Sequence, residues 1–368
     1  MKLQLYFARK FLWMTAGLFV TFAIFMILID MVEQMRRFDA DVLSFTGALL
    51  LASLSVPETL YLILPLVVML STLALFLSLA RTSELVVTRA AGRSALRAII
   101  APVMAAFFVG VLGVTVMNPF VAASKHVYEK RAAEFLGKGG NTFSVSREGL
   151  WLRQGDAEGQ TVIRAGRANL DGTELYDVTF LTFNADSPGQ GGVLRRAEAQ
   201  EATLGNGAWS LRGVKIWPLE VDNPEAEAIY HETLVLPSTL TTEQIRDSFG
   251  SPSSVPIWDL PAFIEDLDNA GFSARAHRVW FQMELALPFF VASMVLIGAG
   301  FTMRHTRFGK TGLMVLLSLL MGFGAFFIRN FAQILGQNGD IPVALAAWAP
   351  PAIAMLMSLG LLLHTEDG

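Results

Sequence analysis

Six long apolar stretches constrain this chain more than any other feature of its sequence. A helix needs roughly 20 mostly apolar residues to cross the hydrocarbon core of a bilayer, and each stretch is long enough. They are Phe11–Ile29, Thr59–Leu79, Ala98–Met117, Phe281–Met303, Leu313–Leu335 and Val343–Leu363. The first is too long for the apolar region of a signal peptide, and no small-residue cleavage site follows it. The sequence therefore predicts an α-helical membrane protein with six transmembrane helices.

Lys and Arg residues in the short connections predict the orientation of these spans, because cytoplasmic loops carry an excess of them. With the N-terminus in the cytoplasm, ten basic residues lie on the cytoplasmic side, and only Arg36 and Arg37 lie in the opposite short loops. The ten are Lys2, Arg9, Lys10, Arg81, Arg89, Arg93, Arg97, Arg304, Arg307 and Lys310. Both termini are then cytoplasmic, and the long segment between spans three and four lies outside.

That long segment has a different composition from the spans. Between Asn141 and Gly250 the chain has nine basic and 16 acidic residues, although the whole chain has a net charge of only −4. Apolar and polar residues alternate in runs such as Leu175–Phe183, and turn signals such as Gly205-Asn206-Gly207 separate the runs. Alternation with β-branched and aromatic residues is typical of half-buried strands. We expect an antiparallel sandwich, a jelly roll or an open barrel.

A short amphipathic pattern follows, between Pro256 and Ser273. Its apolar residues recur at helical spacing, and Asp266 and Asp268 lie on the other side. These apolar residues are Trp258, Leu260, Phe263, Ile264 and Leu267. We predict a helix that either connects the β domain to span four or lies on the membrane surface.

Several kinds of chemistry are excluded or disfavoured by composition and motif. The absence of Cys removes disulfides and thiolate metal sites, and the five His form no metal-binding motif. The Gly309-Lys310-Thr311 sequence resembles the end of a phosphate-binding loop, but Arg304 stands where that motif needs Gly. A net charge of −4 disfavours nonspecific binding to the phosphate backbone of nucleic acid. No nucleophile motif supports a hydrolase. We therefore expect that the chain is not itself an enzyme and binds no cofactor.

The segment Ser83–Gly92 follows span two on the predicted cytoplasmic side. Ser83 can cap a short helix, Glu84 suits its positive end, and Gly92 can terminate it. One interpretation is a juxtamembrane helix that rests against neighbouring spans. The other is a helix that docks into a cytoplasmic partner, with Glu84 meeting a basic residue and Leu85 and Val86 filling a groove.

Charged residues near the outer ends of spans form a second candidate site. Four of them lie at helical spacings after span one, namely Asp30, Glu33, Arg36 and Arg37. They either satisfy one another on the surface or bind anionic lipid headgroups, for which guanidinium groups suit phosphate. Arg329 and Glu284 lie within predicted spans, where charge is costly, so we expect cavity-facing positions, or snorkelling for Arg329.

Taken together, this topology and several short motifs resemble the lipopolysaccharide-export permease family, LptF and LptG, over essentially the whole chain. The motifs are Ser83–Val87 closing at Ala91-Gly92, Leu54–Pro57 with Leu64-Pro65, Glu148–Trp151, and Ile341-Pro342. The Ser-Glu-Leu-Val-Val and Gly-Leu-Trp forms resemble LptG more than LptF. The sequence departs from the family at Asp30 and Glu284, where a basic residue is expected.

The resemblance implies a permease of an ABC-type exporter in the bacterial inner membrane, with its all-β, jellyroll-like domain in the periplasm. It also implies a sister permease LptF, a dimer of the ATPase LptB that hydrolyses ATP, and the partners LptC and LptA, with lipopolysaccharide as substrate. The implied ATPase-coupling residues are Ser83, Glu84, Leu85, Val86, Arg89 and Gly92. The implied lipid-binding residues are Arg36 and Arg37, to which Arg329, Asp30 and Glu33 are added as candidates.

These expectations divide the chain into four parts. Residues 1–120 hold spans one to three with the coupling helix at about 83–92, and residues 121–255 form the periplasmic β-jellyroll domain. Residues 256–275 form a periplasmic amphipathic connecting helix, and residues 276–368 hold spans four to six. Two other classes remain open: a secondary lipid transporter driven by an ion gradient, and a membrane scaffold that transmits mechanical movement.

Overall fold

The computed structural model consists of two compact units. It describes residues 2–38, 44–84, 87–88, 95–135, 144–146, 149–156, 159–169, 173–184, 193–205, 207–221, 223–238, 240, 252–269, 273–303 and 311–367. A helical unit comprises Met1–Leu136, Ser253–Trp258 and Arg275–Gly368, and a sheet unit comprises Gly137–Pro252 and Asp259–Ala274.

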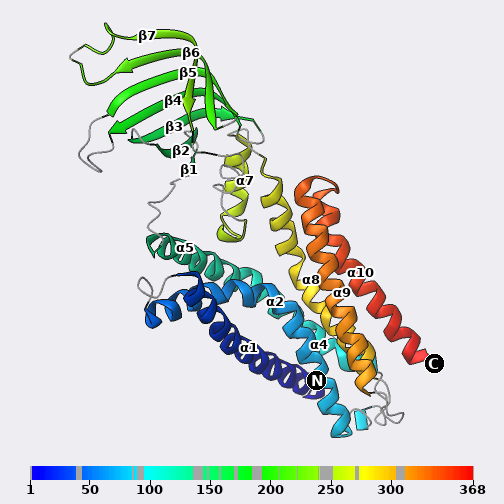
Figure 1. Ribbon diagram of the computed structural model, residues 1–368. Helices are drawn as coiled ribbons and strands as arrows, with labels where there is room; N and C mark the ends of the chain where they lie inside the picture. The colour runs from blue at the N-terminus through cyan, green and yellow to red at the C-terminus, as the bar shows by residue number, and fades with distance from the viewer. Residues whose placement is uncertain are drawn as a thin grey trace. The chain divides into compact units, whose positions relative to one another are not determined.

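Six helices among the described residues are long and apolar enough to cross a membrane, which confirms the six predicted spans. The N-terminal helices are α1 (Lys2–Arg37), α2 (Phe45–Arg81), α4 (Ala95–Leu112), the π-helical turn η1 (Gly113–Met117) and α5 (Asn118–Phe135). The C-terminal helices are α8 (Arg275–Thr302), α9 (Thr311–Asn338) and α10 (Val343–Asp367). Figure 1 shows α8, α9 and α10 side by side, as their mutual contacts require.

The third span is followed by more helix than the sequence analysis predicted. The expected span ended at Met117 and the expected β domain began at residue 121, but α5 continues to Phe135 and the first strand among the described residues begins at Ser144. Good helix formers such as Ala, Lys and Glu fill this stretch, so the chain stays helical after its apolar run ends.

Helix α8 forms the centre of the helical unit. In the most apolar stretch of α8, 83% of the residues are buried inside the subunit. The corresponding shares are 6% for α1 and 17% for α9. Close packing around α8 depends on small residues: a Cβ on Gly110 of α4 would lie 2.6 Å from the Cα of Pro288, and one on Gly298 would lie 2.9 Å from Thr72 Cγ2. Small residues at such crossings let helix backbones approach closely inside a membrane. The helical core is therefore organised around one apolar helix.

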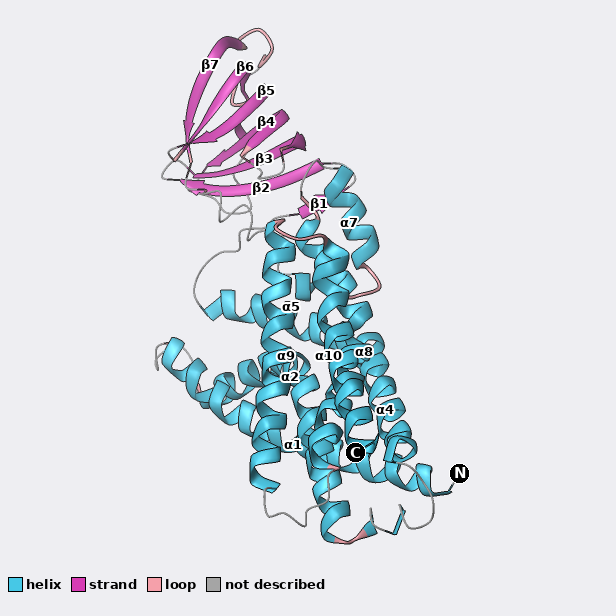
Figure 2. Ribbon diagram, turned by 90° about the vertical axis from the view of Figure 1, so that its right-hand side faces the viewer, coloured by secondary structure: helices cyan, strands magenta, loops and turns pink. Residues whose placement is uncertain are grey.

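The sheet unit contains one seven-stranded antiparallel sheet among the described residues, which confirms the predicted all-β domain. The strands are β1 (Ser144–Ser146), β2 (Gly149–Asp156), β3 (Gly159–Ala168), β4 (Glu174–Asn184), β5 (Val193–Gly205), β6 (Ala208–Pro218) and β7 (Ile229–Pro237). Each strand pairs with its neighbours in the chain, so the sheet is a meander, as Figure 2 shows for β2 to β7.

A row of irregular positions crosses this sheet from β3 to β7. Ala165 pairs with Val178 and Arg167 with Tyr176, which leaves Gly166 and Asp177 outside the regular ladder. The paired positions of the next strands likewise omit one residue each, namely Gln200 of β5, Gly213 of β6 and Glu232 of β7. Asp177 and Gly213 have positive φ angles of 55° and 62°. Such a row shifts the alternation of side chains between the two faces of each strand.

One face of the sheet carries the core of this unit. Trp209 and Phe180 are both almost fully buried, and their rings meet edge to face at 6.3 Å. Helix α7 (Leu260–Asn269) adds Leu267 to the same apolar cluster, with Phe263 packed against it. The predicted amphipathic helix therefore exists, but it is shorter than predicted, and its apolar face covers the sheet core. Trp258, which was expected on that face, precedes the helix and is 65% exposed.

Candidate functional site

The C-terminal end of α2 is tied to α1 through Glu84. Lys10 Nζ lies 3.2 Å from Glu84 Oε1, and the hydroxyl of Thr82 donates to the same oxygen at 2.8 Å. Partial burial acts to raise the pKa of the Glu84 carboxyl, but the hydrogen bonds from Thr82 and Lys10 outweigh it, so its pKa lies below its usual value. The basic residue that meets Glu84 in this subunit is thus Lys10, which sequence reasoning did not pair with it.

Ser83 begins a helical turn, as expected, although its backbone differs from that of a usual capping serine. Its carbonyl accepts a hydrogen bond from the Val87 amide at 3.1 Å, and Thr88 Oγ1 donates to the Glu84 carbonyl at 2.7 Å. The φ angle of Ser83 is +58°, whereas an N-cap residue usually has extended backbone. The other predicted coupling residues, Leu85, Val86, Arg89 and Gly92, lie outside the described residues.

Asp30 at the other end of α1 joins two helices. Its Oδ2 accepts a hydrogen bond from Ser55 Oγ of α2 at 2.5 Å and another from Gln34 Nε2 at 3.3 Å. Gln34 is itself buried and donates to Tyr128 Oη of α5 at 3.1 Å. Asp30 therefore has a structural role between α1 and α2. No sequence spacing pointed to Ser55 or Tyr128 as partners.

The neighbouring arginines differ in their contacts. Arg36 pairs with Glu33 at 3.5 Å across one helical turn, and both side chains are mostly exposed. Arg37 donates from Nη1 to Tyr128 Oη at 3.3 Å, and its guanidinium lies 5.9 Å from the centre of the Phe38 ring. An exposed pair of this kind contributes little to stability, so the Arg36 guanidinium can exchange its partner for an anion at low cost.

Glu284 and Arg329 lie inside the helical unit and line one cavity of about 140 Å³. The hydroxyl of Tyr61 donates to Glu284 Oε2, and the Arg329 guanidinium lies 5.5 Å from the centre of the Phe290 ring. Three further polar residues, namely Asn118, Trp280 and Gln333, also line the cavity. The prediction that Glu284 and Arg329 face a cavity agrees with this geometry, whereas Arg329 does not snorkel to the surface.

A closed polar triangle borders the same cavity and was missed by sequence reasoning. Lys125 Nζ lies 2.6 Å from Glu58 Oε1 and 2.8 Å from Ser253 Oγ, and Ser253 Oγ donates to Glu58 Oε1 at 2.9 Å. These contacts tie α2, α5 and the segment Ser253–Trp258 together.

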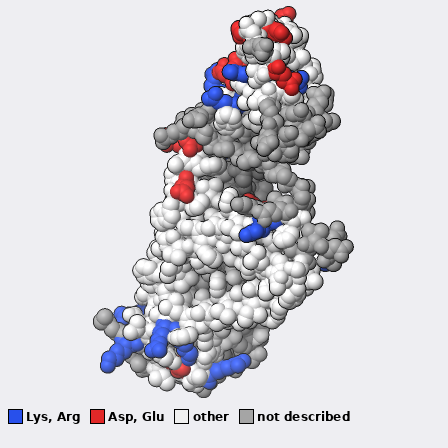
Figure 3. All heavy atoms as spheres, turned by 90° about the vertical axis from the view of Figure 1, so that its left-hand side faces the viewer, with Lys and Arg blue, Asp and Glu red and all other residues white. Residues whose placement is uncertain are grey.

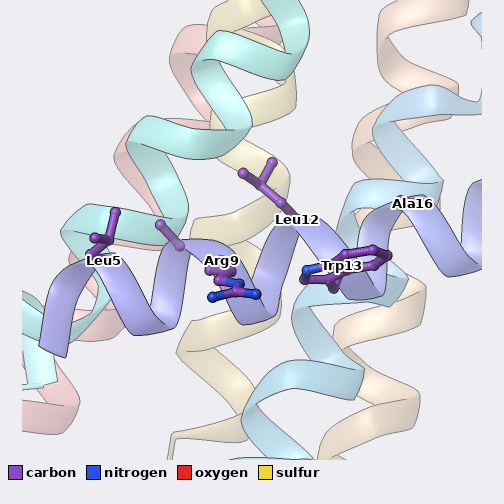
Figure 4. Close-up of a pocket in the computed structure, with 6 residues that line it drawn as sticks. Leu5, Arg9, Leu12, Trp13 and Ala16 are labelled. Carbon is purple, nitrogen blue, oxygen red and sulfur yellow. The ribbon is translucent and has the colours of Figure 1, made fainter. Parts of the chain in front are cut away.

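One side of α1 is hollowed into an apolar groove of about 490 Å³ (Figure 4). The groove is lined by residues of α1 spaced three and four apart, namely Leu5, Ala8, Arg9, Leu12, Trp13 and Ala16. Trp13 and Leu5 are strongly exposed in the single chain. This face of α1 is therefore free for another helix or for lipid acyl chains.

Charge is distributed unevenly over the helical unit. In Figure 3, Lys and Arg side chains gather at one end of this unit, beside a broad belt of surface without charge. The helix ends that lie near the two termini carry exposed basic residues. They include Lys2, Arg9, Arg81 and Arg97. Among the described residues no group of three His, Asp or Glu side chains could hold a metal ion.

Comparison with known proteins places these features in one family. The model of the family "Lipopolysaccharide export system permease LptF/LptG" matches residues 5–364. The chain is 24% identical to the lipopolysaccharide export system permease protein LptG of Haemophilus influenzae over 345 residues, which cover 92% of each chain. It is 23% identical to LptG of Escherichia coli strain K12 over 341 residues, which cover 92% of this chain and 91% of that protein.

Proposed function

Because this chain belongs to the LptF/LptG family of lipopolysaccharide export permeases, we propose that it is one half of an ABC-type exporter that extracts lipopolysaccharide from the inner membrane. The observation that carries the proposal is the family match over residues 5–364, which includes all six membrane-length helices and the sheet unit. The other half of the exporter is a sister permease, LptF. A separate ATPase, a dimer of LptB, supplies the energy.

The exposed faces of α1 and α9 support assembly with other membrane subunits. In the most apolar stretch of α1, only 6% of the residues are buried inside this subunit, and in that of α9 only 17% are buried. The groove on α1 that contains Trp13 can accept a neighbouring helix, because helices in lipid associate by close packing along such ridges and small residues. We place the sister permease and LptC against these faces, with LptA receiving the lipid beyond them.

The basic end of the helical unit supports a cytoplasmic position for the termini and for Ser83–Gly92. The positive-inside rule relates Lys and Arg in short loops to the cytoplasm. The sheet unit then lies in the periplasm. In this orientation Glu84 stands at the entrance of a segment that contacts the ATPase, and Lys10 keeps its carboxylate ionised and oriented. Nucleotide-driven closure of the ATPase would move this segment and, through α2, the permease.

Arg36 and Arg37 are the proposed contacts for the lipid phosphates. Arg36 is mostly exposed, and its partner Glu33 lies on the same helix, so a phosphate can replace the carboxylate with two parallel hydrogen bonds. Arg329, which was expected in the same role, is only 6% exposed in this subunit. It reaches lipid only if the helices around it separate.

Copurification tests the proposal. The tagged full chain, extracted in mild detergent, is expected to bring down a second permease of the same family and an ATPase dimer, with lipopolysaccharide detected by mass spectrometry. A chain that exports lipid with an ion gradient alone, in vesicles without ATP, would instead support a secondary transporter. Assembly with the ATPase but without any bound lipid would favour a mechanical scaffold.

Glu84→Arg tests the coupling contact separately. It is expected to reduce ATPase copurification by at least tenfold while the sister permease is retained. Glu33→Arg, a matched charge reversal in the exposed part of α1, should leave the ATPase bound. Lys10→Gln removes the charged internal partner of Glu84 and leaves Thr82 in place; if it reduces ATPase binding as much as Glu84→Arg does, Glu84 acts inside the subunit and the coupling assignment is wrong.

A further inference from the structure

Two buried polar atoms at the cavity of the helical unit have no hydrogen-bond partner among the described residues, and the buried guanidinium of Arg329 lines the same cavity. Arg329 makes no hydrogen bond or ion pair with the residues that the structure describes, and its guanidinium lies over the Phe290 ring. Oε1 of Glu284, a residue only 1% exposed, also has no partner, and neither has Nε1 of Trp280. Buried polar groups are almost always hydrogen-bonded. Two unpaired atoms and a buried guanidinium that line one cavity therefore indicate a ligand that is not part of the protein.

The charges around the cavity select the kind of ligand. An anion that binds Arg329 would also meet the carboxylate of Glu284, and a cation that binds Glu284 would meet Arg329. Trp280 Nε1 and Arg329 can only donate hydrogen bonds, whereas Glu284 Oε1 accepts them when ionised. The ligand must therefore be neutral and able to both donate and accept.

The size of the cavity further limits which ligand can bind there. A volume of about 140 Å³ is far too small for a lipid, whereas one water molecule takes up about 30 Å³ in the liquid. The cavity thus has room for about four water molecules. The polar lining residues Asn118, Trp280, Glu284, Arg329 and Gln333 supply the neighbours that buried water requires.

We propose that this cavity is an internal hydration site. It holds a small cluster of ordered water molecules that accept hydrogen bonds from Arg329 and Trp280 and donate one to Glu284 Oε1. The inference does not depend on the proposed transport function.

The surroundings explain why water is held here. Asn118 lines the cavity and is buried, and its Oδ1 accepts a hydrogen bond from the Ile257 amide at 2.9 Å. The π-helical turn η1 ends directly before Asn118, and such turns often re-aim side chains at functional positions. Water then joins Arg329 of α9 to Glu284 of α8. A contact made through water can exchange its hydrogen bonds when α9 shifts, which a dry packed contact cannot do.

Radiolytic hydroxyl labelling of the purified full chain tests this inference, because water inside a cavity generates radicals beside the residues that line it. Tyr61, which lines the cavity, is expected to be oxidised many times faster than Phe76, a comparably buried aromatic residue in the apolar core of the same unit. Equal, slow labelling of both would mean a dry cavity and would overturn the proposal.

Cavity-filling variants separate internal water from bulk solvent. Val121 lines the cavity and is buried, so Val121→Phe should occupy part of its volume and reduce the labelling of Tyr61 several-fold. Leu287→Phe fills the same space from α8 and serves if the first variant fails to fold. Fast labelling of Tyr61 that survives in the folded variant would come from bulk solvent and would contradict an internal site.

A high-resolution density map gives an independent reading if neither variant folds. Peaks within hydrogen-bond distance of Arg329, Trp280 Nε1 and Glu284 Oε1 are expected. An empty cavity at a resolution that shows water elsewhere in the helical unit would refute the inference.

Discussion

The variant Tyr61→Phe tests how much the helical unit depends on one buried hydroxyl. Tyr61 is 6% exposed, and its hydroxyl donates to Oε2 of Glu284, whose other oxygen has no protein partner. The substitution keeps the aromatic ring and removes this donor alone. The carboxylate of Glu284 then has no hydrogen bond from Tyr61, and only water in the cavity can compensate.

The expected loss follows from the burial and charge of the acceptor. A hydrogen bond to a charged group contributes about 1.5–3 kcal/mol, and an unsatisfied buried group costs a similar amount. We therefore expect Tyr61→Phe to lower the free energy of unfolding by about 2–3 kcal/mol. At roughly 2–4 °C per kcal/mol for a unit of about 240 residues, the melting temperature should fall by about 4–12 °C.

Thermal unfolding of the purified chain, followed by tryptophan fluorescence in one detergent at one heating rate, measures this fall. Tyr6→Phe is the matched control, because Tyr6 is 44% exposed and its hydroxyl meets Lys10 at the surface, where water replaces it; its expected cost is below about 1 kcal/mol. In a Glu284→Leu background the Tyr61 change should cost little. Equal melting temperatures for the two Tyr→Phe variants would refute the reasoning.

Three further predictions concern other parts of the molecule. Trp209→Ala opens a cavity in the sheet core and should destabilise the sheet unit by about 3–5 kcal/mol, measured as faster proteolysis within its strands. Gly110→Ala places a Cβ 2.6 Å from the Cα of Pro288 and should cost about 1–3 kcal/mol through overpacking, measured as a lower melting temperature. The pKa of Glu84 is depressed, so the stability that its contacts contribute is present above the pKa of the unfolded chain and is lost as the pH falls through the folded pKa. The ¹³C shift of its carboxylate should therefore titrate below the usual range of a glutamate, and Lys10→Gln should move the midpoint upward.

Each of these predictions has a control. Trp258→Ala removes an exposed tryptophan and should leave proteolysis of the strands unchanged; equal effects would mean that Trp209 does not organise the core. Gly17→Ala adds a Cβ with nothing within 4 Å and should not lower the melting temperature. A Glu84 midpoint that is the same with and without Lys10 would show that the ion pair does not form in solution.

Six membrane spans and an all-β domain could be predicted from the amino-acid sequence alone. Both follow from patterns that are local in the chain: an apolar run long enough to cross a bilayer, and alternation that repeats every two residues. The helical unit and the seven-stranded sheet confirm both. The family resemblance was also visible, because it depends on the order of short motifs rather than on contacts.

Which side chains contact one another could not be predicted in this way, because it depends on how the elements pack. Strict alternation places Leu175 and Phe180 on opposite faces of β4, yet both are buried, because the irregular position at Asp177 shifts the phase between them. That shift depends on pairing across five strands, from Gly166 to Glu232, and no single strand contains it.

The charged residues of the spans show the same limit. Sequence reasoning expected Arg329 and Glu284 to face a cavity, since isolated charge is costly in lipid. It could not assign Tyr61 as the donor to Glu284, because 223 residues separate them in the chain. Asp30 likewise accepts a hydrogen bond from Ser55 on the next helix. Hydropathy gives the cost of placing a charge in the membrane, whereas helix packing decides which group offsets it.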